Sequence, residues 1–234
     1  MRNLPRQASV RLDCVLPIGD DNTRRETLPY VNYSLIGLNV LAFIVELSQP
    51  DPNLFILEWG VIPAAITHGA ALVTLLTSMF LHAGWAHIGG NMLFLWIFGD
   101  NVEDRLGHAR YLAFYLACGI AAGLVQSFLA PTSLVPSIGA SGAISGVLAA
   151  YMLMFGTNTV RVLIGWFFVA AVPAFVMIGV WIFIQFVNGF ASFADTAQSG
   201  GIAYGAHVGG FAAGILLAWL IPKRRAVRRY YRFP

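Results

Sequence analysis

Basic side chains occupy only a few short stretches of this 234-residue chain, and long apolar stretches separate them. No Lys or Arg occurs between Glu26 and Asp104 or between Val162 and Pro222. Hydrophobic residues make up 58% of the chain and charged residues 11%, and the mean hydropathy is +0.71. Segregated charge with this composition is typical of a membrane protein that crosses the bilayer several times. The net charge of +3 therefore indicates topology and not a nucleic-acid-binding surface.

The apolar stretches predict an all-α polytopic fold with six transmembrane helices. The expected spans are Tyr30–Leu47, about Ala86–Phe98, Tyr111–Leu129, Gly139–Phe155, Val162–Val187 and Gly201–Ile221. Six crossings place both termini and all fourteen Lys and Arg residues on the cytoplasmic side. The expected organisation is a loosely ordered cytoplasmic tail over residues 1–29, a six-helix membrane domain over 30–222 and a basic cytoplasmic tail over 223–234.

The fourth span is too short to cross a bilayer. It covers about 25 Å at about 1.5 Å per residue, whereas the hydrocarbon core is about 30 Å thick. A helix of this length must begin below one membrane surface, where non-helical backbone is tolerated only if protein or a water-filled cavity surrounds it. We therefore expect Ser141 to lie at a helix N-terminus inside the membrane, at the floor of a water-filled pocket.

Four polar side chains in or beside apolar spans require an explanation, because such groups are costly in a membrane and usually face a bundle interior or a cavity. These residues are His82, His87, Asn91 and His207. His87 and Asn91 are four residues apart, so they share one helix face.

Two glycine pairs indicate which helices approach each other. Gly142 and Gly146 lie in the fourth span, and Gly210 and Gly214 lie in the sixth. Small residues at this spacing allow close approach of two helix backbones. Contact between these faces would bring the hydroxyl of Ser141 close to the imidazole of His207.

This combination predicts a serine nucleophile with His207 as its base, a pairing that requires a separation of about 2.6–3.2 Å. The backbone N–H of Ser141 at the helix start is expected to stabilise an oxyanion, with His87 and Asn91 as further donors. No carboxylate is suitably placed to complete a triad. The sequence therefore predicts a Ser–His dyad with a neutral histidine.

These residues together resemble the rhomboid family of intramembrane serine proteases, and the resemblance covers all six spans. The matching motifs are His82-x4-His87-x3-Asn91, Gly139-Ala140-Ser141-Gly142, Ala206-His207-x2-Gly210-x3-Gly214 and the turn Glu103-Asp104-Arg105-Leu106-Gly107. The resemblance implies an endopeptidase that cleaves single-span membrane proteins in or near their transmembrane helix. It implies Ser141 as nucleophile, His207 as base, and His87 and Asn91 as oxyanion donors, with no metal and no cofactor.

The resemblance also implies that the 49–85 connection is a membrane-embedded loop, and that the fifth span with the Asn188–Gly200 loop forms a substrate gate and cap. The expected location is a bacterial plasma membrane, with the lipid bilayer and single-span substrates as partners and no nucleic acid. Some family members stack an aromatic residue, four positions after the nucleophile, on the histidine. This chain has Ser145 there, so the group that orients His207 stays open.

Two other functions stay open at this point. One is a catalytically inactive rhomboid-like protein that binds membrane helices, although such a protein is expected to have lost its nucleophile or base. The other is a metal-using membrane protein built on His82, His87 and His207, but H-E-x-x-H is absent and no carboxylate clearly joins these histidines. His82 is expected to tie the first loop to the second span. The substrate, its cleavage site, the pathway and the oligomeric state also stay open.

Overall fold

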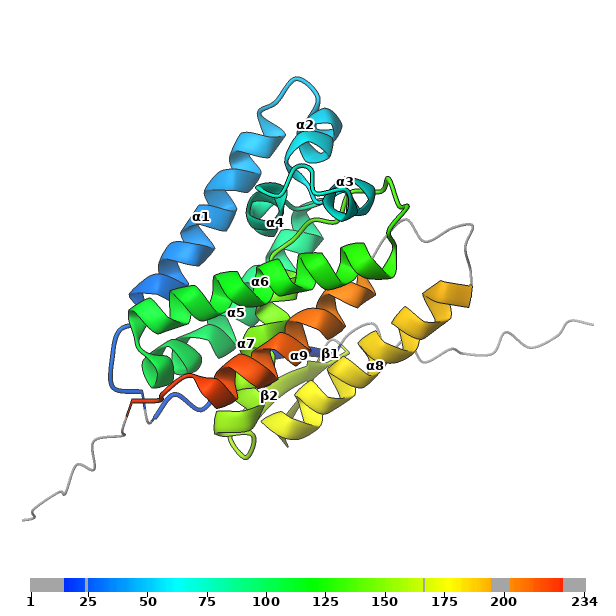
Figure 1. Cartoon of the computed structure of the whole chain (residues 1–234). Helices are drawn as coiled ribbons and strands as arrows, with labels where there is room; N and C mark the ends of the chain where they lie inside the picture. The colour runs from blue at the N-terminus through cyan, green and yellow to red at the C-terminus, as the bar shows by residue number, and fades with distance from the viewer. Residues whose placement is uncertain (1–14, 24, 166, 195–202, 225–234) are drawn as a thin grey trace, which may run out of the picture.

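The computed structural model describes residues 15–23, 25–165, 167–194 and 203–224. The fold is mainly helical and includes one three-stranded antiparallel sheet (Figure 1). In chain order the elements are β1 (Val15–Asp20), α1 (Tyr30–Leu47), α2 (Pro52–Trp59), α3 (Pro63–Thr67), α4 (Thr74–Thr77), the 3₁₀ helix η1 (Ser78–Phe80), α5 (Trp85–Leu106), α6 (His108–Leu129), α7 (Ser141–Phe155), β2 (Thr159–Ile164), β3 (Phe168–Pro173), α8 (Ala174–Ala194) and α9 (Tyr204–Leu220).

Two of the described helices, α1 and α6, are long and apolar enough to cross a membrane, judged by length and composition. Shorter apolar helices are α7, the Ala174–Gly189 part of α8, and α9. The expected first span coincides with α1, and the expected third span lies within α6. The count of six crossings stays a prediction.

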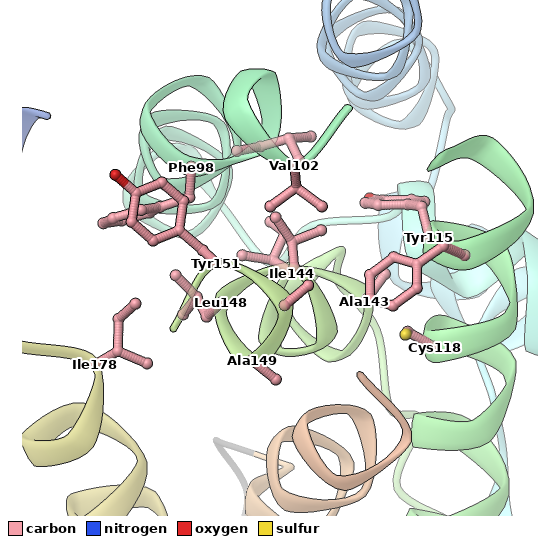
Figure 2. Close-up of a cluster of buried hydrophobic side chains, with 14 of the residues drawn as sticks. Phe98, Val102, Tyr115, Cys118, Ala143, Ile144, Leu148, Ala149, Tyr151 and Ile178 are labelled. Atoms are coloured by element: carbon pink, nitrogen blue, oxygen red, sulfur yellow. The ribbon is translucent and has the colours of Figure 1, made fainter. Parts of the chain in front are cut away.

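The centre of the fold is α7, which packs against α5, α6, α8 and α9. Every residue from Gly142 to Tyr151 is buried, and apolar side chains of α5, α6 and α8 surround this helix (Figure 2). A helix that is apolar on all sides is stable only when protein or lipid encloses it. At about 1.5 Å per residue its 15 residues span about 22 Å, so this helix is as short as the sequence predicts.

The two glycine faces meet, as their spacing predicts. A Cβ atom built on Gly210 would lie 2.0 Å from the carbonyl oxygen of Gly142, and one built on Gly214 would lie 2.5 Å from the Cα of Gly146. Both distances are far inside van der Waals contact, so no side chain fits at this crossing of α7 and α9. In Figure 1, α9 lies between α6 and α8 and crosses α7.

The acidic residues after Phe98 do not form a turn, because α5 continues as a helix to Leu106. Glu103 is fully buried, and its carboxylate accepts the backbone N–H groups of Val31 at 3.0 Å and Asn32 at 2.7 Å. These donors belong to the first turn of α1, where no intrahelical acceptor exists. The charged end of α5 therefore serves as the N-terminal cap of another helix.

The expectation of a loosely ordered N-terminal tail is wrong for the part of it that the structure describes, because residues 15–20 form β1. Asp20, at the end of this strand, accepts hydrogen bonds from the hydroxyl of Tyr151 at 2.6 Å and from Nδ2 of Asn101 at 2.7 Å. Burial raises the pKa of the Asp20 carboxyl, and these hydrogen bonds oppose that shift. Nearby, Arg25 forms an ion pair with Asp100.

The expected fifth span, Val162–Val187, is also wrong in its first half, where the chain forms the β2–β3 hairpin before α8 begins. Alternation explains the hairpin: Val160 and Val162 are buried on one face of β2, while Thr159 and Arg161 face outward. β2 is the central strand and pairs antiparallel with both β1 and β3. The apolar run at the start of the expected span is rich in β-branched residues and forms a pair of strands. The fold is therefore mainly, but not purely, α-helical.

The remaining connections differ in detail from the expectations. The 49–85 segment contains the short helices α2, α3 and α4 and the 3₁₀ helix η1. α8 continues to Ala194, so only the first part of the expected Asn188–Gly200 loop is described, and it is helical. Residues 195–200 of that loop, the start of the expected sixth span and most of the basic C-terminal tail lie outside the described residues.

Replacing Gly210 with Ala tests the contact between α7 and α9. The added methyl group would overlap the Gly142 carbonyl, so we expect a loss of about 1–3 kcal/mol of stability. Thermal unfolding of the purified protein in detergent measures this change. Gly37→Ala in α1 is the matched control, because no atom lies within 4 Å of a Cβ built there. Equal unfolding midpoints for the two variants would contradict the close contact.

Candidate active site

Ser141 and His207, each near the start of its helix, form a direct hydrogen bond. Ser141 is the first residue of α7, and His207 lies in the first turn of α9. Oγ of Ser141 lies 2.8 Å from Nε2 of His207. His207 is only 9% exposed. The structure therefore brings together the two residues that the sequence pairs, at a distance suited to proton transfer.

The orientation of His207 is fixed from its other side by Gln185 of α8. Nδ1 of His207 lies 2.8 Å from Oε1 of Gln185. An amide oxygen only accepts hydrogen bonds, so Nδ1 carries the proton and donates it to Gln185. In this tautomer Nε2 has a free lone pair, which accepts the hydroxyl hydrogen of Ser141.

Aromatic rings also border His207, although they come from other positions than some family members use. The ring of Trp181 lies 5.7 Å from the imidazole, centroid to centroid, and that of Tyr204 lies 6.5 Å away. Ser145, which occupies the position of the aromatic residue in those members, donates from its hydroxyl to the carbonyl of Ser141 at 2.6 Å. Such bonding to the preceding turn is a common structural use of a helical serine.

Two side-chain donors lie beside the backbone that leads into Ser141. A Cβ atom built on Gly139 would lie 2.8 Å from Nε2 of His87 and 3.6 Å from Nδ2 of Asn91. Gly139 has φ +116°, a conformation that L side chains rarely adopt. Glycine at this position thus satisfies both the backbone geometry and the close approach of His87.

Neither donor has a hydrogen-bond acceptor among the described residues. Nδ1 of His87 accepts the backbone N–H of Ala83 at 3.3 Å, which leaves the proton on Nε2. Nδ2 of Asn91 is buried and has no hydrogen-bond partner among the described residues. The first N–H groups of α7 have no intrahelical acceptors, and no side chain caps this helix start. Donors from two helices thus converge where negative charge is favoured.

A small cavity adjoins the nucleophile. Its lining includes Ser78, Ser137, Gly139, Ser141 and Gly142. About 20 Å³ is open to the centre of a water molecule, which is enough to admit one. Space for water beside the half-buried hydroxyl of Ser141 is what hydrolysis at this site requires.

His82 lies outside this arrangement of groups but contacts it. The residue is fully buried, and its backbone N–H donates to Oε2 of Glu46 in α1 at 3.0 Å. Its ring centroid lies 5.0 Å from that of His87. His82 therefore links the loop after η1 to both α1 and α5. Within the described part of the chain, no group of three or more His, Cys, Asp or Glu side chains is placed to hold a metal ion.

Sequence reasoning missed Gln185, although a signal for it was present. It is the only polar side chain in the run from Ala174 to Val187, and a lone polar residue in such a run usually faces the protein interior. Gln126 carries a similar signal in α6, and its Oε1 accepts the backbone N–H of Ala206 at 3.1 Å. Both glutamines thus reach the start of α9.

A serine hydroxyl that is hydrogen-bonded to an oriented histidine, beside unengaged donors, is the arrangement that serine hydrolases use. Comparison with known proteins agrees with this class. Residues 69–224 match the Rhomboid domain family. This match covers most of the chain, which therefore belongs to the rhomboid family of membrane-embedded proteins, generally intramembrane serine proteases. Inactive members also exist.

Relatives come from bacteria and from eukaryotic organelles. The chain is 29% identical to Rhomboid protein 1, mitochondrial, of Saccharomyces cerevisiae over 204 residues, which cover 86% of this chain and 56% of that protein. It is 34% identical to Rhomboid protease GluP of Bacillus subtilis over 132 residues, covering 56% of this chain and 25% of that protein. It is 33% identical to Rhomboid-like protein 11, chloroplastic, of Arabidopsis thaliana over 159 residues, covering 63% of this chain and 51% of that protein. The chain thus matches between a quarter and just over half of the length of these relatives.

Proposed function

We propose that this protein is an intramembrane serine endopeptidase that cleaves single-span membrane proteins in or near their transmembrane helix. The observation that carries the proposal is the 2.8 Å hydrogen bond between Oγ of Ser141 and Nε2 of His207. Membership of the rhomboid family supports the choice of a peptide bond as the target.

In the proposed reaction, the hydroxyl of Ser141 attacks the carbonyl carbon of the scissile peptide bond while Nε2 of His207 accepts its proton. Negative charge develops on the carbonyl oxygen. The backbone N–H of Ser141, Nε2–H of His87 and Nδ2–H of Asn91 stabilise this oxyanion.

Collapse of the tetrahedral intermediate breaks the C–N bond, and His207 gives its proton to the leaving amine. An acyl-enzyme on Ser141 remains. Water from the adjoining cavity then attacks the ester, with His207 again as base, and releases the second product with a free carboxylate. The cycle regenerates the hydroxyl and the neutral imidazole, and it consumes one water molecule.

The proposed topology has six crossings, with α1, α5, α6, α7, α8 and α9 as the spanning helices. Every basic residue of the sequence then lies on the cytoplasmic side, which agrees with the positive-inside rule. The ion pair of Arg25 with Asp100 and the hydrogen bond from Nη1 of Arg105 to the carbonyl of Arg224 lie at one end of the bundle. This clustering supports a shared cytoplasmic end for the N-terminal segment, α5 and the end of α9.

We further propose a bacterial plasma membrane as the location, with the lipid bilayer and single-span substrates as the partners. α8, most of whose exposed side chains are apolar, is the proposed side of substrate entry. Relatives assigned to mitochondria and chloroplasts make organelle membranes the alternative location.

Removing either member of the dyad should abolish cleavage. We expect Ser141→Ala and His207→Ala to reduce hydrolysis of a reconstituted single-span substrate to background, because the nucleophile or its base is lost. Ser145→Ala and His68→Ala are the matched controls. The first removes a neighbouring hydroxyl that bonds backward along α7, and the second removes an exposed histidine whose Nδ1 lies against the carbonyl of Ala64. Cleavage by the Ser141 variant at the wild-type rate would refute the assignment of Ser141 as the nucleophile. A wild-type protein that is folded but shows no turnover would instead favour an inactive protein that binds membrane helices.

Asn91→Ala should slow the reaction without abolishing it. One oxyanion donor is worth about 10²–10³ in turnover, so kcat should fall by about that factor while KM changes little. Asn53→Ala, an exposed residue of α2, provides the comparison. Unchanged kcat in the Asn91 variant would remove Asn91 from the site.

Activity should also fall at acid pH, because protonated His207 cannot accept the proton of Ser141. The pH dependence of kcat/KM reports this ionisation in the free enzyme. A profile with no acid limb at any pH at which the protein stays folded would be incompatible with a histidine base.

A further inference from the structure

One polar side chain, Gln185, interrupts the apolar run from Ala174 to Val187 in α8, and this side chain faces inward. Ile178 is fully buried, and Trp181 and Gln185 are partly buried at positions three and seven residues further on. This spacing puts all three on one helix face. The neighbouring Ile184 and Phe186 are exposed at 44% and 60%. The amide is therefore held against α9 and not against lipid.

The partner of this amide is the proposed base. Oε1 of Gln185 lies 2.8 Å from Nδ1 of His207, on the opposite side of the ring from Ser141, which lies 2.8 Å from Nε2. Both ring nitrogens of His207 are thus hydrogen-bonded. Gln185 accepts the hydrogen bond from Nδ1, and Ser141 donates one to Nε2.

We propose that Gln185 is a positioning residue for catalysis: its carbonyl oxygen holds His207 in the tautomer and rotation in which Nε2 accepts the proton of Ser141. This inference deepens the proposed function and rests on it. Gln185 takes the place that a carboxylate occupies in a serine protease triad, where the acceptor at Nδ1 sets the tautomer. A neutral acceptor avoids placing a charge in an apolar interior. The nucleophile, the base and the positioning residue then come from three helices, α7, α9 and α8.

The competing interpretation is that this hydrogen bond only fastens α8 to α9. A fastening role predicts lower stability when the bond is lost, with no change in the intrinsic reactivity of the Ser141 hydroxyl. The positioning role predicts slower attack by that hydroxyl even on a small electrophile that does not need to pass α8. The rate of labelling by a small fluorophosphonate therefore separates the two roles.

The test uses the full chain in detergent, with Gln185→Leu, Gln185→Glu and the control Phe186→Leu. Leucine keeps the approximate size of the side chain and removes the acceptor. We expect Gln185→Leu to lower the second-order labelling rate at neutral pH about three- to tenfold, as the loss of one hydrogen bond at the base implies. Phe186→Leu, on the adjacent exposed face, should label at the wild-type rate.

Gln185→Glu keeps an acceptor at the same reach. It should label within about threefold of the wild-type rate at neutral pH. A carboxylate at Nδ1 favours the imidazolium, so the acid limb of the pH–rate profile should move to higher pH by about one unit. This shift is expected only if the side chain at position 185 contacts Nδ1 of His207 in the active protein, as the structure has it.

Two results would overturn the inference. The first is Gln185→Leu labelled as fast as the wild type; the second is a Gln185→Glu profile that superimposes on the wild-type profile. All labelling rates are measured well below the lowest unfolding temperature among the variants, so that a loss of stability in Gln185→Leu does not lower the rate. Failure of the proposed function looks different, because the wild-type protein would then not be labelled at Ser141 at all.

Discussion

The close contact between α7 and α9 is the constraint on which the rest of the site depends. Two glycine faces allow the helix backbones to touch, and no larger residue fits between Gly210 and the Gly142 carbonyl. The hydrogen bond between Ser141 and His207 is worth only about 0.5–1.5 kcal/mol, which is less than overpacking of such a contact can cost. The helix crossing therefore sets the distance between the two side chains, and the hydrogen bond follows from it.

The position of this crossing explains why the site can hold water inside an apolar bundle. α7 is short and enclosed by α5, α6, α8 and α9, so its N-terminus lies within the protein and not in lipid. The free N–H groups of that N-terminus, the amide of Asn91 and the ring of His87 face the same point beside Gly139. The start of α1 is satisfied in a different way. There the carboxylate of Glu103, near the end of α5, accepts the first N–H groups of the helix.

Much of the site could be predicted from the sequence because its cues are local. The spacing of Gly210 and Gly214 on one helix face, and the i, i+4 relation of His87 and Asn91, need no tertiary information. The hydrogen bond of Gln185 to His207 could not be predicted, since it depends on how α8 returns against α9. The β2–β3 hairpin was missed because a short apolar run fits both a strand and a span. Glu103 was assigned to a turn because its hydrogen-bond donors lie more than seventy residues earlier in the chain.

Mapping the residue that a fluorophosphonate modifies in the wild-type protein tests the central claim most directly. We propose that the helix crossing activates a single hydroxyl, that of Ser141. Mass spectrometry of the labelled protein should therefore find one adduct, on the peptide that contains Ser141, and prior alkylation of His207 should prevent it. An adduct on Ser145 or on any other serine, or no adduct on a folded protein, would contradict the account.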